Sequence, residues 1–584
     1  MPIKDVLESF ANHTSMHGLP KVINARSTLT RCFWAVICVA AGAMFCMQMT
    51  EVLTRYFSYP KKVTVEVVPT PVPFPAISMC NMRNLDFDVL NTINRKFIED
   101  HRPLNHINTS TNPFIREYMK TVAKYGPLWY EYQEEYPLIF QEVFSRTTFS
   151  SNIPEDIISL AAVQLDEFVV NCHFGGHGCN RTRDFVKFFD QYYFNCFTYT
   201  AYQDKNEDEF SLSEGIENGW SAILFSGSNM LDKNEDIRVL PGLHESQSPV
   251  SASEGVRVVI HPPDTQPFPF TEGYDVPPGF SASFGIKPRM NIRIGPPHGN
   301  CTNKNPFGNK NKSRYRGISC QKMCLQSHVI KTCGCSDSSL PKVPDTDVRP
   351  CRNNDDFPDS CMFNATSECL RILFRLYARI QCARQTRDWI TKNTTLLVDC
   401  QCFPPCDEVL YDVSYSLSKW PASGYEGDAA YYDVFYIEGF KERFKTTPKY
   451  EKIKTYFNDS TRETTMKDFA RLNVYVADSN VIKTQESGDY TTNQLVSDIG
   501  GQLGLWVGIS VITLTEVIEL LCEIMRYLLS AKMTTPKRDI EPAGDRMRNG
   551  KYRPAAMEGL PPTQYDGYDS ADLMLAYYPD PLRR

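Results

Sequence analysis

The hydrophobic pattern of the chain contains two segments that are long enough to cross a membrane. The first, residues 32–55, is apolar apart from a few polar positions near its end. A spanning helix needs about 20 apolar residues, so we expect a transmembrane helix over 32–55. A signal peptide is the alternative interpretation, but its apolar core would be shorter and would begin nearer to the first residue.

The second segment, residues 495–530, is apolar but carries carboxylates. An ionisable side chain at the centre of a membrane helix costs about 2.5–3.5 kcal/mol, so several of them must face water rather than lipid. On a continuous helix, which advances about 100° per residue, one stripe holds every acid. These acids are Asp498, Glu516, Glu519 and Glu523. The sequence therefore predicts a second transmembrane helix whose acidic stripe lines a pore.

Ser510 does not fit that continuous helix, because it lies on the side opposite to the acids. Either it does not line the pore or the helix breaks there. A break is favoured by the neighbouring glycines, which are Gly500, Gly501, Gly504 and Gly508. Close helix packing is the alternative role for these glycines. Rings of carboxylates favour cations, and two spans enclose a pore only as a closed oligomer.

Basic residues predict the side of the membrane on which each segment lies. They flank both apolar segments toward the chain ends, so residues 1–31 and 531–584 are expected in the cytoplasm. Residues 56–494 are then extracellular. Sixteen of the 20 cysteines lie between Cys80 and Cys406, an even number that is typical of a disulfide-linked ectodomain.

Two further features of residues 56–494 bear on this prediction. Closely spaced cysteines such as Cys333 and Cys335 also suit a metal, but an oxidising compartment favours disulfides, and we expect no metal. Seven Asn-x-Ser/Thr sequences are candidate glycosylation sites. They are Asn108, Asn180, Asn300, Asn311, Asn364, Asn393 and Asn458.

The extracellular range mixes strand and helix signals. Alternating residues or short apolar runs between turn residues predict strands at 61–68, 221–225, 256–261 and 472–476. Residues 81–195 combine helical patterns with aromatic clusters, and residues 301–406 are dense in cysteine. The tail 531–584 is polar and bears proline, so we expect it to be disordered.

Several function classes are excluded by composition and motif. The net charge of -7 argues against a nucleic-acid partner, because such domains usually present a basic surface. The sequence has no Gly-x-Ser-x-Gly elbow, His-Glu-x-x-His pair or phosphate-binding loop. We therefore expect neither an enzyme nor a bound cofactor.

Over most of residues 17–523 the chain resembles the degenerin and epithelial sodium channel superfamily, which includes the acid-sensing channels. The resemblance rests on motifs that follow one another in a fixed order. They are His17-Gly18, Phe74-Pro-Ala-Ile-Ser-Met-Cys80-Asn, Cys320-x3-Cys324-x8-Cys333-Gly-Cys335, Cys400-Gln-Cys-Phe-Pro-Pro-Cys406, Asp498-Ile-Gly-Gly-Gln and Gly508-Ile-Ser510.

This resemblance implies an α+β membrane protein. It would have two transmembrane helices and a large disulfide-rich α/β ectodomain divided into palm, β-ball, finger, thumb and knuckle parts. Residues 81–195 would be finger-like and residues 301–406 thumb-like. The assembly would be a homotrimer, or a heteromer with related subunits.

The resemblance also implies roles for residues of the pore. Gly508, Ile509 and Ser510 match the selectivity filter, as an extended break in the second helix, and sodium would be the permeant ion. Glu516 matches a family acid below the filter. The other implied positions are the extracellular entrance and gate at Ser497, Asp498 and Gly501, the further pore acids Glu519 and Glu523, and the cytoplasmic gating motif His17 and Gly18.

Disulfide pairs are likewise taken from the resemblance. They are Cys80–Cys196, Cys172–Cys179, Cys301–Cys406, Cys320–Cys402, Cys324–Cys400, Cys333–Cys382, Cys335–Cys351 and Cys361–Cys369. The stretch 336–399 is longer than in acid-sensing channels.

The stimulus is the open question within the superfamily. The cysteine-rich insert and Trp420-Pro421 resemble invertebrate FMRFamide-type channels, which implies a plasma-membrane sodium channel opened by an extracellular neuropeptide and blocked by amiloride. A cationic, aromatic peptide would bind aromatic and acidic residues. The candidates are Trp129, Tyr130, Glu131, Tyr132, Glu134, Tyr136, Phe188, Phe189 and Asp190. Acid gating or constitutive opening is the alternative, and an ATP-gated trimeric channel is a more distant one.

Overall fold

The computed structural model describes most of the chain between residues 3 and 533. The described residues are 3–69, 72–86, 114, 117, 132, 135–145, 150–201, 214–227, 253–308, 313–344, 346–353, 357–358, 360–363, 366–393, 399–421, 438–447, 449–458 and 468–533. The predicted tail lies outside them except for 531–533. The chain divides into two compact units, residues 41–506 and residues 1–40 with 507–584.

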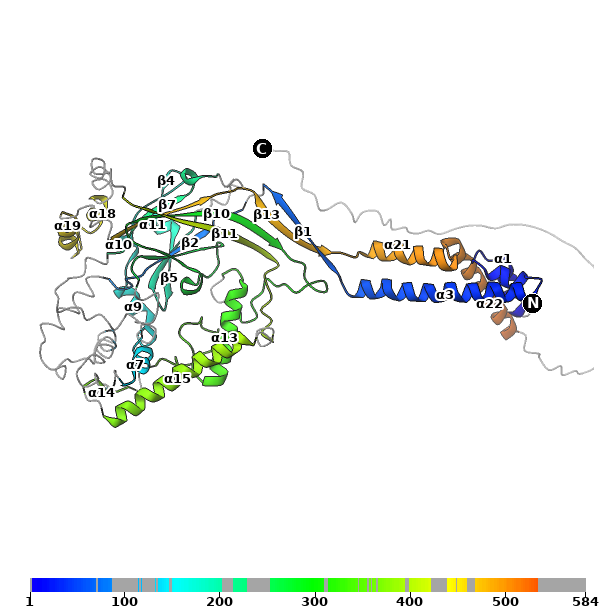
Figure 1. Ribbon diagram of the computed structural model, residues 1–584, viewed down its shortest axis with the longest axis horizontal. Coiled ribbons are helices and arrows are strands. Elements are labelled where there is room, and N and C mark those ends of the chain that lie inside the picture. Colours follow the sequence, from blue (N-terminus) through cyan, green and yellow to red (C-terminus); the bar gives the residue numbers. More distant parts are fainter. Residues whose placement is uncertain are drawn as a thin grey trace, which may run out of the picture. The chain divides into compact units, whose positions relative to one another are not determined.

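The larger of two β-sheets in residues 41–506 has the order β1-β13-β10-β12-β7-β3-β4, with β11 paired to β10. Its strands are β1 (Lys61–Val68), β3 (Val169–Phe174), β4 (His177–Gly178), β7 (Trp220–Phe225), β10 (Phe280–Ile292), β11 (Asp407–Lys419), β12 (Phe469–Val476) and β13 (Val481–Gly488). Strands β1 and β13 run antiparallel along the edge, with Lys61 opposite Gly488 (Figure 1). The strand that follows the first apolar segment therefore pairs with the strand that precedes the second.

The smaller sheet has the order β5-β6-β2-β8-β9. Its strands are β2 (Ala76–Asn81), β5 (Phe185–Asp190), β6 (Phe194–Tyr199), β8 (Val256–His261) and β9 (Tyr274–Val276). The two sheets share one apolar core, to which β2 contributes Ile77 and Met79 and β12 contributes Leu472 and Val474. All four strands predicted from the sequence are confirmed.

Short helices surround the sheets. They are α7 (Pro137–Val143), α9 (Glu155–Ala161), α10 (Leu165–Phe168), α11 (Arg181–Asp184), the 3-10 turn η3 (Ile216–Asn218), α12 (Pro269–Glu272), α18 (Glu438–Arg443) and α19 (Tyr450–Asn458). Within the range 81–195, which was expected to be finger-like, residues from 169 onward supply strands to both sheets. The reason is burial, since side chains such as Phe168, Phe194 and Phe197 are almost fully enclosed by the sheets.

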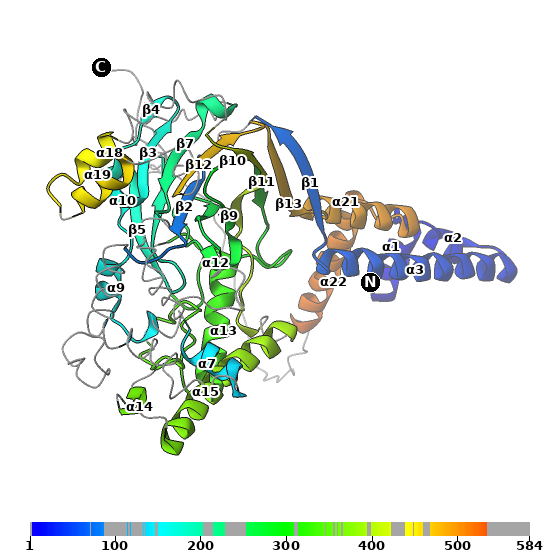
Figure 2. The same cartoon turned by 60° about the vertical axis from the view of Figure 1, so that its left-hand side comes forward.

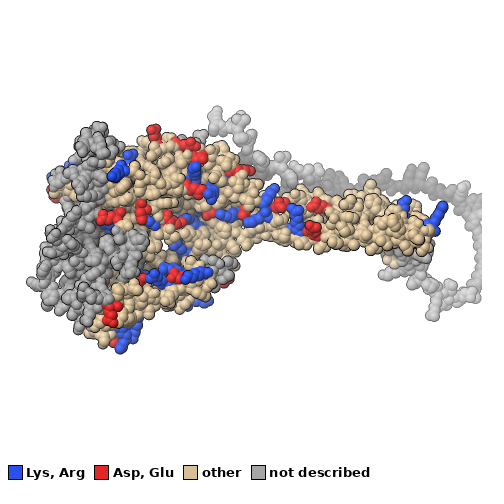
Figure 3. Space-filling model, viewed as in Figure 1, with Lys and Arg blue, Asp and Glu red and all other residues tan. Residues whose placement is uncertain are grey.

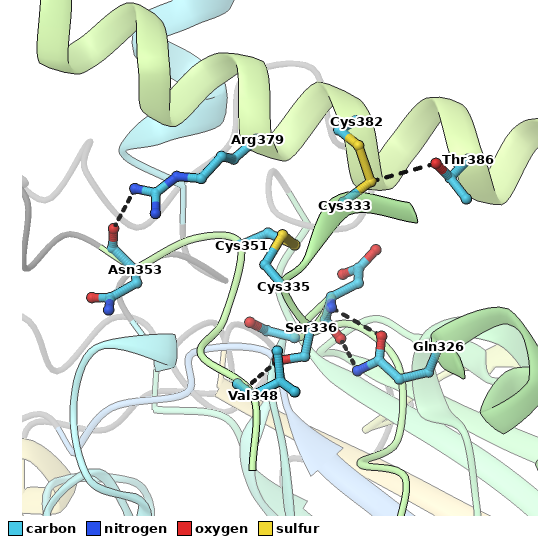
Figure 4. Close-up of a disulfide and its surroundings, with 12 residues drawn as sticks. Gln326, Cys333, Cys335, Ser336, Val348, Cys351, Asn353, Arg379, Cys382 and Thr386 are labelled. Carbon is cyan, nitrogen blue, oxygen red and sulfur yellow. Dashed lines mark hydrogen bonds between the residues drawn. A yellow bond between two sulfur atoms is a disulfide. The ribbon is translucent and has the colours of Figure 1, made fainter. Parts of the chain in front are cut away.

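The cysteine-rich range forms a pair of long helices, α13 (Gly317–Cys333) and α15 (Ser367–Lys392), with the short α14 (Ser360–Phe363) before α15. Gly334, with a φ of +67°, ends α13. Figure 4 shows the disulfide Cys333–Cys382 joining the two helices, and Cys335–Cys351 beside it. In the same place the side-chain amide of Gln326 donates to the carbonyl of Asp337 at 3.0 Å and accepts from its N–H at 2.9 Å.

The structure brings together the same eight cysteine pairs that the family resemblance implies. They are Cys80–Cys196, Cys172–Cys179, Cys301–Cys406, Cys320–Cys402, Cys324–Cys400, Cys333–Cys382, Cys335–Cys351 and Cys361–Cys369. The sulfurs of Cys324 and Cys400 also lie near His328, but their mutual bond leaves no thiolate for a metal there.

The apolar segments form long helices. Helix α3 (Thr28–Phe57) contains the predicted span 32–55 and is long and apolar enough to cross a membrane. The second segment consists of α21 (Thr492–Gln502), a π-helical turn η8 (Leu503–Val507) and α22 (Val511–Met533), which pass the same test only when counted as one broken span. The N-terminal residues add α1 (Ile3–His13) and α2 (Leu19–Asn24). In Figure 3 the surface of α3 and α21 is largely uncharged, whereas charges of both signs are mixed over the sheets.

Candidate functional site

The predicted break in the second apolar segment is present at residues 508–510, which are not helical. Gly508 has a φ of +75°, a left-handed conformation that glycine adopts without steric cost. A Cβ atom at this position would lie only 2.5 Å from Cγ of His17. Both the backbone and the neighbouring imidazole therefore require glycine here.

Ser510 restarts the helix after the break. Its hydroxyl accepts a hydrogen bond from the N–H of Thr513 at 3.3 Å, and the hydroxyl of Thr513 accepts one from the N–H of Ser510 at 3.1 Å. This is the reciprocal pattern of a helix N-cap, which satisfies donors that the first turn leaves unpaired. The Thr513 side chain is completely buried. The break and the start of α22 are thus fixed by two hydroxyl side chains.

The N-terminal loop between α1 and α2 packs against this break. The N–H of His17 donates to the carbonyl of Val507 at 3.1 Å. Gly18 has a φ of +82° and turns the chain into α2, and a Cβ atom there would lie 2.6 Å from Sγ of Cys38. The His17-Gly18 motif and the Gly508–Ser510 motif, which are nearly 500 residues apart in the sequence, therefore form one site.

Glu516 joins the N-terminal loop to α22. Its Oε2 atom accepts hydrogen bonds from the Thr14 hydroxyl at 3.0 Å, the Ser15 N–H at 3.0 Å and the Ser15 hydroxyl at 3.3 Å. The Ser15 hydroxyl also lies 2.6 Å from the Thr513 hydroxyl. Sequence analysis predicted Glu516 but missed the three hydroxyl residues. The pair Thr14-Ser15 just before the His-Gly motif was the available signal.

The other acids of the predicted stripe separate into two groups. On the regular helix α22, Glu519 and Glu523 lie about 60° and about 20° from Glu516, so these three share one face. The continuous helix on which Asp498 was predicted to share their stripe is not present, because the π-helical turn and the non-helical residues interrupt it. The carboxylate of Asp498 instead accepts a hydrogen bond from the hydroxyl of Tyr490. That hydrogen bond raises the pKa of Tyr490 above its usual value.

Helix α21 carries the other residues predicted at the pore entrance. Ser497 is exposed, as is Gly501 one turn later. Cβ atoms added at Gly500, Gly501 or Gly504 would meet no atom within 4 Å. Close packing within one chain therefore does not explain these three glycines. Further along, Trp506 Nε1 donates to the side-chain carbonyls of Gln48 at 2.6 Å and Gln502 at 3.1 Å, which ties α3 to this segment.

The predicted peptide-binding residues fall into separate places. Phe188, Phe189 and Asp190 line a cavity of about 590 Å³, whereas Tyr132 and Tyr136 do not line it and pack against an apolar cluster that includes residues of α15. Trp129, Tyr130, Glu131 and Glu134 lie outside the described residues. The structure thus brings together only part of the predicted set.

Three predicted glycosylation sites are exposed, namely Asn180, Asn300 and Asn393. The side-chain oxygen of Asn180 caps α11 by accepting from two N–H groups. Asn458 is the last residue of α19. Asn108, Asn311 and Asn364 lie outside the described residues.

Comparison with known proteins gives one family over most of the chain. A sequence model described as "Amiloride-sensitive sodium channel" matches residues 10–520. The chain is 27% identical to the FMRFamide-activated amiloride-sensitive sodium channel of Cornu aspersum, over 91% of this chain and 85% of that protein. It is 28% identical to degenerin unc-8 of Caenorhabditis elegans over 64% of this chain, which is 41% of that protein. It is 23% identical to the epithelial sodium channel subunit alpha of Neoceratodus forsteri, over 89% of this chain and 80% of that protein.

Proposed function

Because the chain belongs to the amiloride-sensitive sodium channel family, we propose that it is a peptide-gated sodium channel opened by an extracellular FMRFamide-like peptide. The family consists of membrane-embedded ion channels rather than enzymes. The peptide stimulus is supported by the similarity to the FMRFamide-activated channel of Cornu aspersum, which extends over 91% of this chain.

The observation that carries a conducting role is the environment of Glu516. One oxygen of this carboxylate is occupied by Thr14 and Ser15, whereas its Oε1 atom has no hydrogen-bond partner in the part of the chain that the structure describes. A carboxylate held in this way presents a negative oxygen to a passing cation just after the break at 508–510. Fixed carboxylates in a pore favour cations over anions. We assign the filter to Gly508, Ile509 and Ser510 and the pore acids to Glu516, Glu519 and Glu523.

The proposed channel has two spans and three subunits, with its termini in the cytoplasm. Residues 32–55 and 495–530 would cross the plasma membrane, 56–494 would be extracellular, and 1–31 and 531–584 would be cytoplasmic. Support for an oligomer comes from α21 and the turn η8 that follows it, where Cβ positions at three glycines are open and Val496 and Leu505 are each more than two-thirds exposed. Two spans from one chain cannot surround a pore, so copies must supply the remaining wall.

Peptide gating is preferred to acid gating because the most buried histidine among the described residues is not suited to sense mild acid. His261 hydrogen-bonds the hydroxyls of Ser78 at 2.8 Å and Thr265 at 2.9 Å. Burial is the main cause that lowers its pKa to about 4, so it stays neutral when the pH falls from 7 to 5.

Voltage clamp of cells that express the full chain tests the proposal. We expect FMRFamide to evoke an inward sodium current that amiloride blocks, and Ser497→Trp to give a current without peptide. Ser497→Ala is the matched control, since it changes the side chain without adding bulk, and should stay closed at rest. A current evoked by acid alone would contradict peptide gating. No current under any stimulus, with Ser497→Trp present at the cell surface, would contradict a homomeric channel.

A further inference from the structure

A cavity of about 590 Å³ lies between the smaller sheet and the two long helices α13 and α15. One wall is the end of β5 and the turn that follows it, and a second is the segment 266–271, which includes α12. Figure 2 shows α12 next to α13, and the side chain of Lys322 on α13 contacts Thr271 there. The loop 338–341 and the last turns of α15 complete the lining.

Aromatic side chains form a firm wall in this cavity. The rings of Tyr192 and Phe270 are stacked with centroids 4.2 Å apart and planes inclined by 12°. Phe189 lies parallel to Phe194, at 6.2 Å between centroids. Phe268 contributes a further ring to the lining. Because these rings are held by their neighbours, an aromatic group of a ligand could stack on them without first ordering the wall.

Lys322 is a partly buried cation in the lining of the cavity. Its ammonium donates to the hydroxyl of Thr271 at 2.9 Å and lies 5.0 Å from the centroid of the Phe268 ring. Among the described residues Lys322 has no ion pair, so two of its three N–H donors lack a protein acceptor. Burial is the main cause that lowers its pKa. A half-buried cation next to an aromatic wall is a strong donor for an anionic ligand group.

No acid in the described part of the chain forms an ion pair with Lys322, although Glu272, Asp190 and Asp337 lie near enough to favour its charged form. Arg387 is paired with Asp337 at 2.9 Å, and Lys392 is exposed. Two acids line the cavity. The carboxylate of Asp190 accepts hydrogen bonds from the backbone N–H groups of Tyr192 and Tyr193, at 2.8 and 3.1 Å, and so stabilises the turn after β5. The other, Asp388, is exposed at the rim on α15. The lining therefore holds three cationic side chains, namely Lys322, Arg387 and Lys392, and two anionic ones.

We propose that this cavity binds an extracellular ligand that carries an aromatic ring beside a carboxylate, with the carboxylate at Lys322 and the ring against Phe268, Phe270 and Tyr192. Such a group occurs in small aromatic acids and at the free C-terminus of a peptide that ends in phenylalanine. This activity goes beyond opening by an amidated cationic peptide, because an ammonium at Lys322 attracts a carboxylate and repels a guanidinium.

Binding to the purified full-length channel in lipid nanodiscs tests this directly. The probes are N-acetylphenylalanine and N-acetylphenylalaninamide, which have nearly the same size but differ in charge, and the dissociation constants are measured by calorimetry. We expect the acid to bind about tenfold more tightly than the amide. In Lys322→Met the acid should bind only as well as the amide, while the affinity for the amide stays unchanged and shows that the cavity is intact.

Two further variants and one peptide pair complete the experiment. Lys331→Met removes an exposed lysine of the same helix outside the cavity and should leave the preference for the acid unchanged, and Lys322→Arg should retain it. A tetrapeptide that ends in phenylalanine, compared as free acid and as amide, distinguishes a peptide source from a small acid. Equal affinities for acid and amide, or a preference for the acid that persists in Lys322→Met, would overturn the proposal. So would the absence of binding by every probe.

Discussion

At the scale of single residues, the carboxylate of Glu516 depends on hydroxyl groups far away in the sequence. Thr14 and Ser15 direct three donors at one of its oxygens, and the buried Thr513 contacts Ser15 in turn. A hydrogen bond to a charged group contributes about 1.5–3 kcal/mol. Loss of one such donor should therefore reduce the population of the docked N-terminal loop about tenfold.

This predicts a change in ion selectivity for Thr14→Val, which preserves the shape of the side chain and removes its donor. The sodium-to-potassium permeability ratio, measured from reversal potentials in mixed solutions, should fall because Glu516 is held less firmly. Thr515→Val is the matched control, since in the described part of the chain the Thr515 hydroxyl donates only to the carbonyl of Ile512 in its own helix. An unchanged ratio in Thr14→Val, or an equal fall in both variants, would refute the positioning role.

Glu516 could be predicted from the sequence, but its partners could not. A carboxylate in an apolar segment is costly to insert into a membrane, so its presence there indicates a functional position. Threonine and serine are common residues and carry no comparable insertion cost, and no sequence periodicity links position 14 to position 516. The same limit applies to Tyr490, whose hydroxyl donates a hydrogen bond to Asp498.

At the scale of elements, the break between η8 and α22 depends on one glycine. Gly508→Ala would place a Cβ atom against His17 and impose a left-handed conformation that costs a residue other than glycine about 1–2 kcal/mol. We expect a clear loss of peptide-evoked current per channel at the cell surface, with the current normalised to surface-labelled protein. Gly504→Ala should conduct normally, because a Cβ atom there meets nothing within 4 Å.

Comparing these two alanine variants distinguishes the specific need for glycine at position 508 from a general effect of alanine on helix propensity. Equal currents in Gly508→Ala and the parent chain would show that the bend needs no glycine. A similar loss in Gly504→Ala would instead indicate packing against another subunit.

The break itself was predictable from the sequence, because a straight helix would place Ser510 on the side opposite to the acids. The π-helical turn before it was not, since no residue pattern in 503–507 distinguishes it from an α-helix.

At the scale of the whole molecule, the disulfides hold segments of very different length. Cys80–Cys196 links residues 116 apart in the sequence and joins neighbouring strands of the smaller sheet, where both cysteines are completely buried. Cys361–Cys369 links residues only 8 apart. Which cysteines pair could not be derived from spacing alone, because even eight cysteines allow 105 arrangements. Only the family resemblance supplied the pairs that the structure brings together.

The difference in loop length predicts unequal effects of removing these two bonds. In the chain-entropy description, the long loop stabilises the fold by about 2 kcal/mol more than the short one. Cys80→Ala with Cys196→Ala should therefore lower both the surface expression and the thermal stability of the channel, also because it leaves a gap between β2 and β6. Cys361→Ala with Cys369→Ala should reach the surface and open to peptide nearly as the parent does. Thermal unfolding of the purified proteins measures the difference. If the short-loop variant proved the less stable of the two, local packing around α14 and α15 would contribute more to stability than the entropy of loop closure.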